Sequence, residues 1–169
     1  MTAVFGVTGW SGSGKTSLIE RVVPLLTARG LSVGAFKHAH HSFDIDLPGK
    51  DSHRFRSAGC REVAVSSSRR WVLIHEHGEE DEEAAMNDML ARFDSSCDLI
   101  LVEGYKNASI PKIEVWRREV GQSPIAMENP HVVAVATDDE IDGLPAHCAR
   151  LPLDDAAVIA EFITQRADS

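Results

Sequence analysis

Hydrophobic residues along this chain occur in short continuous runs that alternate with stretches of helical periodicity. Runs of strand length occupy residues 3–8, 31–36, 62–66, 71–75, 99–102, 110–116 and 131–137. Apolar side chains at helical spacing occur in residues 17–29, 85–93 and 158–163. This alternation predicts an α/β fold with three layers and a mainly parallel sheet. Residues 62–66 and 71–75 are close enough in sequence to form a hairpin, which predicts an antiparallel pair at one edge of that sheet.

Glycine, proline and aspartate mark several boundaries of these elements. Gly30 ends the first helix, and Pro24 inside it lacks a backbone donor, so a kink or a restart is expected there. Residues 50–59 read as a short helix with a basic polar face, bounded by glycines. Asp154 is expected to cap the last helix, after a short edge strand at residues 151–153.

The size and charge of the chain narrow the function classes. With 169 residues and 43% hydrophobic content, residues 1–169 suit a single globular domain. The net charge of −9 argues against nonspecific binding to nucleic acid or to an anionic membrane surface. No apolar run is long enough to cross a bilayer, and three widely spaced cysteines fit a reducing compartment, so a soluble cytoplasmic protein is expected. The acidic run at residues 79–83 is interpreted as a first helical turn rather than a metal site.

The most informative stretch is the glycine-rich segment between the first strand and the first helix. Residues 9–16 fit the pattern G-x-x-x-x-G-K-[ST] at every fixed position. The alternative is a Gly/Ser turn that only resembles this pattern, but an apolar strand before it and an amphipathic run after it are what the motif requires. The sequence therefore predicts a phosphate-binding loop, called the phosphate loop below.

The residue types of the phosphate loop match the chemistry of a nucleotide. Gly9, Gly12 and Gly14 reach positive φ and allow successive backbone N–H groups to point into one concavity. Lys15 supplies a positive charge for the β and γ phosphates, and the Thr16 hydroxyl is a ligand for Mg²⁺. Lys15 and Thr16 are accordingly the residues expected to act in any hydrolysis.

Two further groups are predicted to lie at the same edge of the sheet. Glu103 follows the apolar run 99–102, where a carboxylate of a phosphate-loop enzyme holds Mg²⁺; the alternative is a solvated loop acid. The cluster Lys37-His38-Ala39-His40-His41 follows the second strand and is interpreted as a site for a phosphate group, of a nucleotide or of another cofactor. Zinc is the less favoured reading, because no cysteine sits at a matching spacing. Four basic residues suggest either an anion-steering patch or a solvated helix surface: Lys37, Lys50, Arg54 and Arg56.

These motifs together resemble the molybdopterin-guanine dinucleotide biosynthesis protein B (MobB) family. The resemblance runs through residues 9–16, 37–41, 44–52, 58–59, 98–106 and 111–114. It implies a GTP-binding protein with slow, Mg²⁺-dependent GTP hydrolysis that forms homodimers. It also implies an accessory role beside the nucleotidyltransferase MobA, which joins a guanosine nucleotide to molybdopterin.

The resemblance places family functions on individual positions. Asp46 falls where a switch carboxylate reaches the metal, so the expected metal ligands are Thr16, Glu103 and Asp46. The expected nucleotide- or cofactor-binding residues are Gly9, Trp10, Ser11, Gly12, Ser13, Gly14, Lys15, Thr16, Ser17, Lys37, His38, His41, Asp46 and Asp138.

Guanine recognition and hydrolysis are less completely encoded. The guanine signature [NT]-K-x-D is absent, and residues 111–114 only echo it. Asp138, near the end of the strand at 131–137, is a hypothetical acceptor for guanine N1 and N2; the alternative is a turn acid. The sequence has no water-positioning glutamine beside Glu103 and no obvious arginine finger, which predicts slow turnover.

Two other functions remain open from the sequence. A small-molecule kinase shares the phosphate loop, but such enzymes carry an arginine-rich lid, and the adjacent pairs Arg69-Arg70 and Arg117-Arg118 do not lie in a lid-like segment. A noncatalytic adaptor would use the nucleotide only to fix its shape for a partner.

Overall fold

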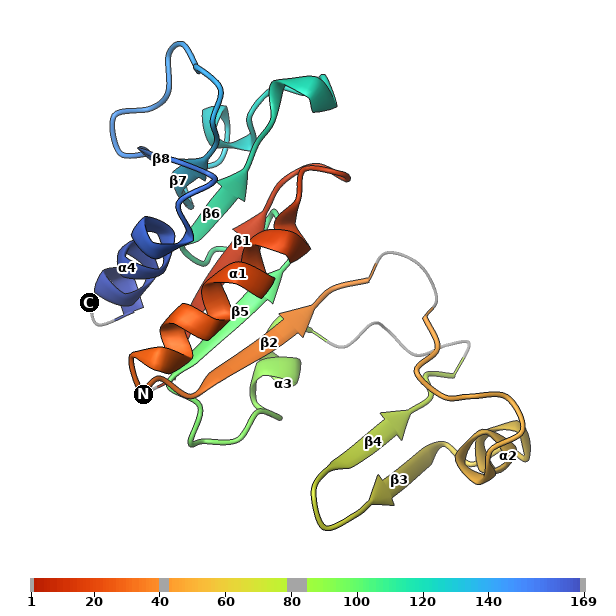
Figure 1. The fold of residues 1–169 in the computed structure, drawn as a ribbon. Helices are drawn as coiled ribbons and strands as arrows, with labels where there is room; N and C mark the ends of the chain where they lie inside the picture. The colour runs from red at the N-terminus through yellow and green to blue at the C-terminus, as the bar shows by residue number, and fades with distance from the viewer. Residues whose placement is uncertain (1, 40–42, 79–84, 168–169) are drawn as a thin grey trace. The chain divides into compact units, whose positions relative to one another are not determined.

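Six parallel strands form the central sheet in the computed structural model, which describes residues 2–39, 43–78 and 85–167. The strand order is β2-β5-β1-β6-β7-β8 (Figure 1). The strands are β1 Ala3–Thr8, β2 Val33–Lys37, β5 Leu99–Glu103, β6 Lys112–Val115, β7 Val132–Ala136 and β8 Ala149–Leu151. β5, β1, β6 and β7 have neighbours on both sides and are almost wholly buried, which explains their continuous apolar runs. The predicted α/β fold with a mainly parallel sheet is confirmed.

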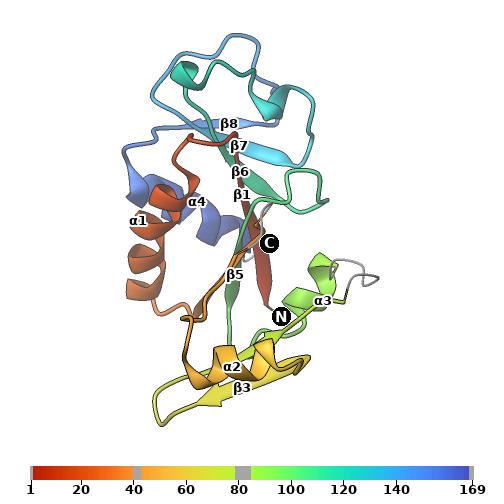
Figure 2. The ribbon, with the colours of Figure 1, turned by 90° about the vertical axis from the view of Figure 1, so that its right-hand side faces the viewer.

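The two long helices cover one face of this sheet. The helices α1 (Lys15–Ala28) and α4 (Ala156–Ala167) lie side by side on it (Figure 2). Leu18, Val22 and Leu26 of α1 point into the core at helical spacing. Near β6 and β7 a second cluster around Trp116 and Val135 includes Ala126 of the 3₁₀ helix η2 (Ile125–Met127). That 3₁₀ helix packs against β7.

Two predictions about the helices can be compared with the structure. α1 runs without interruption through Pro24, so the restart that was one of the two outcomes predicted there does not occur, while a kink stays a prediction. Pro24 is exposed, and the missing bond at this position therefore faces water rather than the core. Asp155, not Asp154, caps α4, because its Oδ1 accepts from the backbone N–H groups of Ala157 and Val158, both at 3.1 Å.

The chain divides into two compact units. The first comprises Met1–His38 with Leu90–Ser169, and the second comprises Ala39–Met89. The single domain expected from chain length therefore stays a prediction. Two short elements complete the list, α3 (Met86–Leu90) and the 3₁₀ helix η1 (Arg118–Val120). The acidic run at 79–83 lies outside the described residues. No helix in the described part of the chain is both long and apolar enough to span a membrane.

The second unit contains the predicted hairpin and short helix. The strands β3 (Glu62–Ser66) and β4 (Trp71–His75) pair antiparallel from Glu62–His75 to Ser66–Trp71, and α2 (Asp51–Ser57) packs against β3. They form a separate two-stranded sheet, so the predicted place of the hairpin at an edge of the main sheet is wrong. The edges of the main sheet are β2 and β8, and both strands of the hairpin have their full length paired with each other.

Candidate functional site

The phosphate loop connects β1 to α1 and is shaped by its glycines. The φ angles of Gly9, Gly12 and Gly14 are 138°, 80° and 99°, a region that side chains rarely adopt. A Cβ at Gly9 would lie 2.4 Å from the carbonyl oxygen of Val115, so only glycine fits there. A Cβ at Gly12 would meet nothing within 4 Å, because this part of the loop borders open space. The loop thus borders open space at Gly12 and leads directly into the first turn of α1, whose amides lack helical partners.

Ser13 places an unpaired hydroxyl inside this loop. Its side chain is 1% exposed, and its Oγ has no hydrogen-bond partner among the described residues. A buried hydroxyl without a partner costs about 1–3 kcal/mol. Its backbone N–H donates to the carbonyl of Trp10 at 3.2 Å, which closes the turn of the loop. The loop therefore combines a tight turn with unused hydrogen-bonding capacity, as a site for a polar ligand requires.

Lys15 lies over the same loop. Its Nζ donates to the carbonyl oxygens of Gly9 at 2.9 Å and Trp10 at 3.0 Å. Burial is the main cause that lowers the pKa of Lys15; nearby Glu103 opposes this change and Lys37 adds to it. An ammonium group that has lost part of its hydration gains from a nearby anion, which fits the predicted phosphate-binding role of Lys15.

Glu103 and Thr16 meet at the carboxyl end of the central strands. The Thr16 hydroxyl donates to Glu103 Oε2 at 3.0 Å and lies 3.2 Å from Oε1, and Lys37 Nζ lies 3.3 Å from Oε1. The register explains the meeting, because Glu103 on β5 pairs with Val7 on β1 and with Lys37 on β2. A buried carboxylate beside a hydroxyl offers the hard oxygen ligands that Mg²⁺ prefers. Within the described ranges no group of three or more His, Cys, Asp or Glu side chains could hold a metal ion, but Mg²⁺ usually takes further ligands from water and substrate phosphates.

The structure places His38 beside this pair. His38 follows β2, its backbone N–H donates to the Glu103 carbonyl at 3.0 Å, and its ring stacks on Tyr105 with centroids 4.3 Å apart. Tyr105 has a φ of 43°, which is unusual for a residue other than glycine. Lys37 and His38 therefore lie at the predicted edge of the sheet.

Trp10, Ser11 and Ser17 are the remaining predicted residues of the loop region. The Trp10 indole N–H donates to the carbonyl of Ser123 at 2.9 Å, and Lys106 Nζ lies 4.8 Å from the centre of its ring. Ser11 and Ser17 are exposed, Ser17 in the first turn of α1. Trp10 is thus fixed to a neighbouring loop, while both serines remain accessible to a ligand.

The predicted residues of the second unit have partners within that unit. Asp46 accepts from the Ser52 hydroxyl at 2.7 Å and from Arg56 Nη1 at 3.5 Å. Arg56 also pairs with Asp44 and Glu76, and its bond to Asp44 lowers the pKa of that carboxyl. The charge of Arg56 is therefore matched by acids, which favours the reading of this helix as ion-paired surface over an anion-steering patch. A metal-binding role for Asp46 stays a prediction, and His41 lies outside the described residues.

Comparison with known proteins identifies the family of this chain. The sequence model of the family described as molybdopterin guanine dinucleotide synthesis protein B (MobB) matches residues 4–138. The chain belongs to the MobB family. It is 39% identical over 167 residues to the molybdopterin-guanine dinucleotide biosynthesis adapter protein of Escherichia coli strain K12, covering 98% of this chain and 93% of the relative. The adapter protein of the same description from Haemophilus influenzae is 38% identical over 163 residues, 95% of this chain and 86% of the relative.

Solved structures of MobB proteins share the fold. A crystal structure of molybdopterin-guanine biosynthesis protein B superposes with a TM-score of 0.73 at 27% identity and covers 98% of this chain and 99% of its own. A MobB homologue from Bacillus stearothermophilus gives a TM-score of 0.72 at 25% identity, with 98% and 97% covered. The similarity therefore spans nearly the whole of both chains.

Residues 111–114 of this MobB chain partly match the guanine signature because they contain two buried charged residues. Lys112 and Glu114 are both 0% exposed on β6. Lys112 Nζ donates to the carbonyls of Lys106 and Ala108, and burial lowers its pKa. Glu114 accepts from the backbone N–H groups of Ile125 at 2.8 Å and Ala126 at 2.9 Å. Burial raises the pKa of Glu114, and these two bonds oppose the rise. Both side chains hold loops in place, so Lys112 and Glu114 have a structural role in this chain.

A cavity beyond the end of β6 brings the predicted residue Asp138 together with residues that the sequence did not place in a site. Its volume is about 450 Å³, and its lining consists of Arg117, Arg118, Glu119, Asp138 and Asp139. Asp138 is held by Leu153, whose backbone N–H donates to its Oδ1 at 3.0 Å. Asp139 Oδ2 accepts from the backbone N–H of Arg118 at 2.9 Å. The arginine pair was visible in the sequence, but only the parallel pairing of β6 with β1 and β7 brings it beside both Asp138 and the phosphate loop.

Proposed function

We propose that this protein binds Mg²⁺ and GTP at the phosphate loop, hydrolyses GTP slowly, and assists the attachment of a guanosine nucleotide to molybdopterin. The observation that carries the proposal is the hydrogen bond from the Thr16 hydroxyl to Glu103 Oε2 at 3.0 Å. Lys15 and Lys37 lie close to the same carboxylate. Membership of the MobB family and the adapter-protein descriptions of its relatives support the pathway.

Different residues would bind the phosphates and the metal ion. The amides of the loop and of the first turn of α1, with Lys15, would hold the phosphates. Thr16 and Glu103 would hold Mg²⁺, which supplies charge neutralisation on the phosphate oxygens when bound. Glu103 is already bonded to Thr16 and Lys37, so it is poorly placed to accept a proton from water.

Slow hydrolysis follows from what surrounds the loop. The chain has two glutamines: Gln165 lies on α4, where it contacts Glu161, and Gln122 lies in the loop after η1. Neither is in the segment that follows Glu103, so the chain supplies no glutamine next to that residue in sequence to orient an attacking water. Binding should therefore be better developed than catalysis.

We assign the preference for guanine over other bases to Asp138. It follows β7, it is exposed, and the bond from Leu153 fixes the orientation of its carboxylate in the cavity wall. Guanine presents N–H donors at N1 and N2, and a carboxylate accepts from both. Asp139 is already bonded to Arg118, which favours Asp138 for this role.

The substitution Asp138→Asn tests this assignment. We expect GTP affinity to fall about tenfold or more, because a charged hydrogen bond is lost, while affinity for xanthosine triphosphate rises. Xanthine carries an oxygen in place of the N2 amine, and the new amide can donate to it. Competition titrations give both affinities. The exposed Asp142→Asn is the matched control. An unchanged ratio of the two affinities would remove Asp138 from base recognition.

The accessory role is testable in a reconstituted reaction of MobA, molybdopterin and Mg·GTP. We expect this protein to increase the rate of dinucleotide formation, and the variant Thr16→Ala to lose that effect. GTP labelled at the γ position should release its label to water. Transfer of the label to a nucleoside or to the pterin would show a kinase instead. Full stimulation with a GTP analogue that cannot be cleaved between the β and γ phosphates would show a noncatalytic adaptor.

A further inference from the structure

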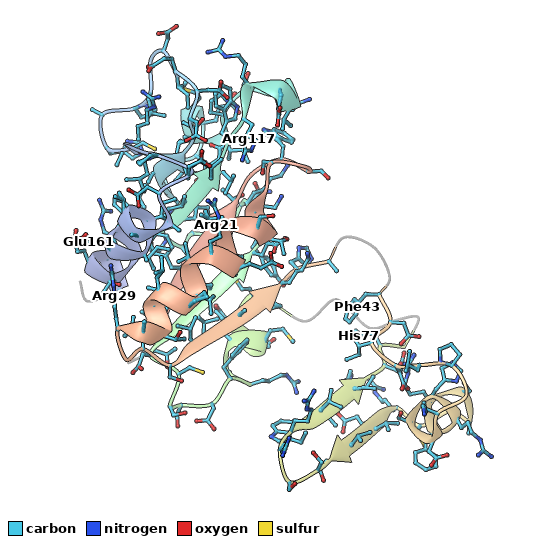
Figure 3. The ribbon with its side chains drawn as sticks, in the orientation of Figure 1. Arg21, Arg29, Phe43, His77, Arg117 and Glu161 are labelled. Atoms are coloured by element: carbon cyan, nitrogen blue, oxygen red, sulfur yellow. The ribbon has the colours of Figure 1, made fainter. Side chains whose placement is uncertain are left out.

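We infer that Arg117 forms one wall of the base site, with its guanidinium plane stacked on the purine of the bound nucleotide. This inference rests on the proposed function, because it concerns the same nucleotide. Arg117 lies just beyond the end of β6, next to the phosphate loop (Figure 3). Its Nε donates to the Ser13 carbonyl at 3.2 Å, and a Cβ on Gly14 would lie 4.0 Å from that Nε. The side chain is half-buried and tied to the loop through one bond.

The position of Arg117 in the sheet favours the base over the terminal phosphate. β5 and β6 flank β1 on opposite sides, and Glu103 ends β5 whereas Arg117 follows β6. In the proposed function, Mg²⁺ and the terminal phosphate bind on the β5 side of the loop, where Thr16, Glu103 and Lys37 meet. The β6 side leads toward β7 and Asp138. A group on this side therefore faces the sugar and base end of the nucleotide.

Of the two arginines that flank the cavity, Arg117 has the guanidinium with fewer protein partners. Arg118 also lines the cavity of about 450 Å³, but its guanidinium donates to the Glu140 carbonyl at 2.8 Å and lies 3.9 Å from Asp139 Oδ1. Arg117 donates a hydrogen bond only from its Nε, to the Ser13 carbonyl. Within the described part of the chain its two Nη groups have no hydrogen-bond partner. It shares the cavity wall with Asp138, the acceptor assigned to the guanine edge.

The chemistry of the two side chains is complementary. A guanidinium is planar and weakly hydrated and stacks on aromatic faces, whereas a carboxylate reads the donors at a ring edge. A stacked cation contributes affinity without distinguishing purines, because guanine and adenine both present a π face. Arg117 would therefore supply binding strength and Asp138 the choice of base.

Titration with GTP and with inorganic tripolyphosphate, both in Mg²⁺, separates this role from phosphate binding. We expect Arg117→Ala to weaken GTP about tenfold and tripolyphosphate less than twofold. Arg117→Lys keeps a donor for the Ser13 carbonyl but lacks the plane, and it should still weaken GTP several-fold. The matched control is Arg29→Ala, at the opposite end of α1, which should change neither ligand (Figure 3).

Each other outcome has a definite meaning. Equal weakening of GTP and tripolyphosphate by Arg117→Ala would make Arg117 a phosphate ligand or a support of the loop, and would overturn the inference. Unchanged GTP affinity in both Arg117 variants would overturn it as well. A wild-type protein that binds tripolyphosphate but not GTP would defeat the proposed function itself, and the base site with it.

Discussion

Replacing Lys15 by alanine is expected to weaken Mg·GTP binding about a hundredfold and to abolish measurable hydrolysis. The ammonium is partly desolvated over the loop, and a charge-assisted contact of this kind contributes about 3 kcal/mol to binding an anion. Its present partners are the carbonyls of Gly9 and Trp10, two half-buried residues of the loop. Displacement of a fluorescent GTP analogue and phosphate release measure the two effects.

An exposed cation at the opposite end of α1 provides the control for this change. Arg29 is the C-cap residue of α1, whereas Lys15 begins the helix. Arg29→Ala removes the same charge from the protein, so its GTP affinity should match that of the wild type. If Lys15→Ala and Arg29→Ala bind GTP equally well, the phosphate loop is not the nucleotide site.

Glu114→Gln is expected to lower the free energy of unfolding by about 2–3 kcal/mol. Both carboxylate oxygens of Glu114 accept from backbone N–H groups, at Ile125 and Ala126, inside a fully buried site. Glutamine offers one oxygen and turns an N–H₂ donor toward the second backbone donor, which leaves buried groups unpaired. Urea denaturation of the two proteins measures the difference.

The control for this experiment is a nearby glutamate whose carboxylate makes no buried hydrogen bond. Glu128 ends η2 and is exposed, so Glu128→Gln should leave the stability within about 0.5 kcal/mol of the wild type. A Glu114→Gln variant as stable as this control would show that the two backbone bonds contribute little, and a guanine-contact role for residues 111–114 would have to be reconsidered.

Local patterns predicted the phosphate-loop side of the site well. Glycine spacing predicts the loop directly, and the apolar run 99–102 places Glu103 at the carboxyl end of a buried strand. Because parallel strands end at a common edge, Thr16 and Glu103 were expected to approach, and they do so at 3.0 Å. The residue types and the common edge of parallel strands were enough to predict this contact.

Contacts between distant segments could not be predicted in the same way. Arg117 meets Ser13 because β6 pairs with β1, and nothing in the residues around Arg117 indicates that pairing. The hairpin was recognised from its own pattern, but its separation from the main sheet depends on which edges find partners. Asp155 rather than Asp154 caps α4 because a helix boundary is decided by packing over a whole turn.

Calorimetric titration of the wild-type protein with GTP, in Mg²⁺ and again in EDTA, tests the central claim most directly. The account predicts one saturable site in Mg²⁺ and clearly weaker binding in EDTA, because Thr16 and Glu103 then lack the ion that links them to the phosphates. Heat of binding that is absent in Mg²⁺, or identical with and without the metal, would contradict it.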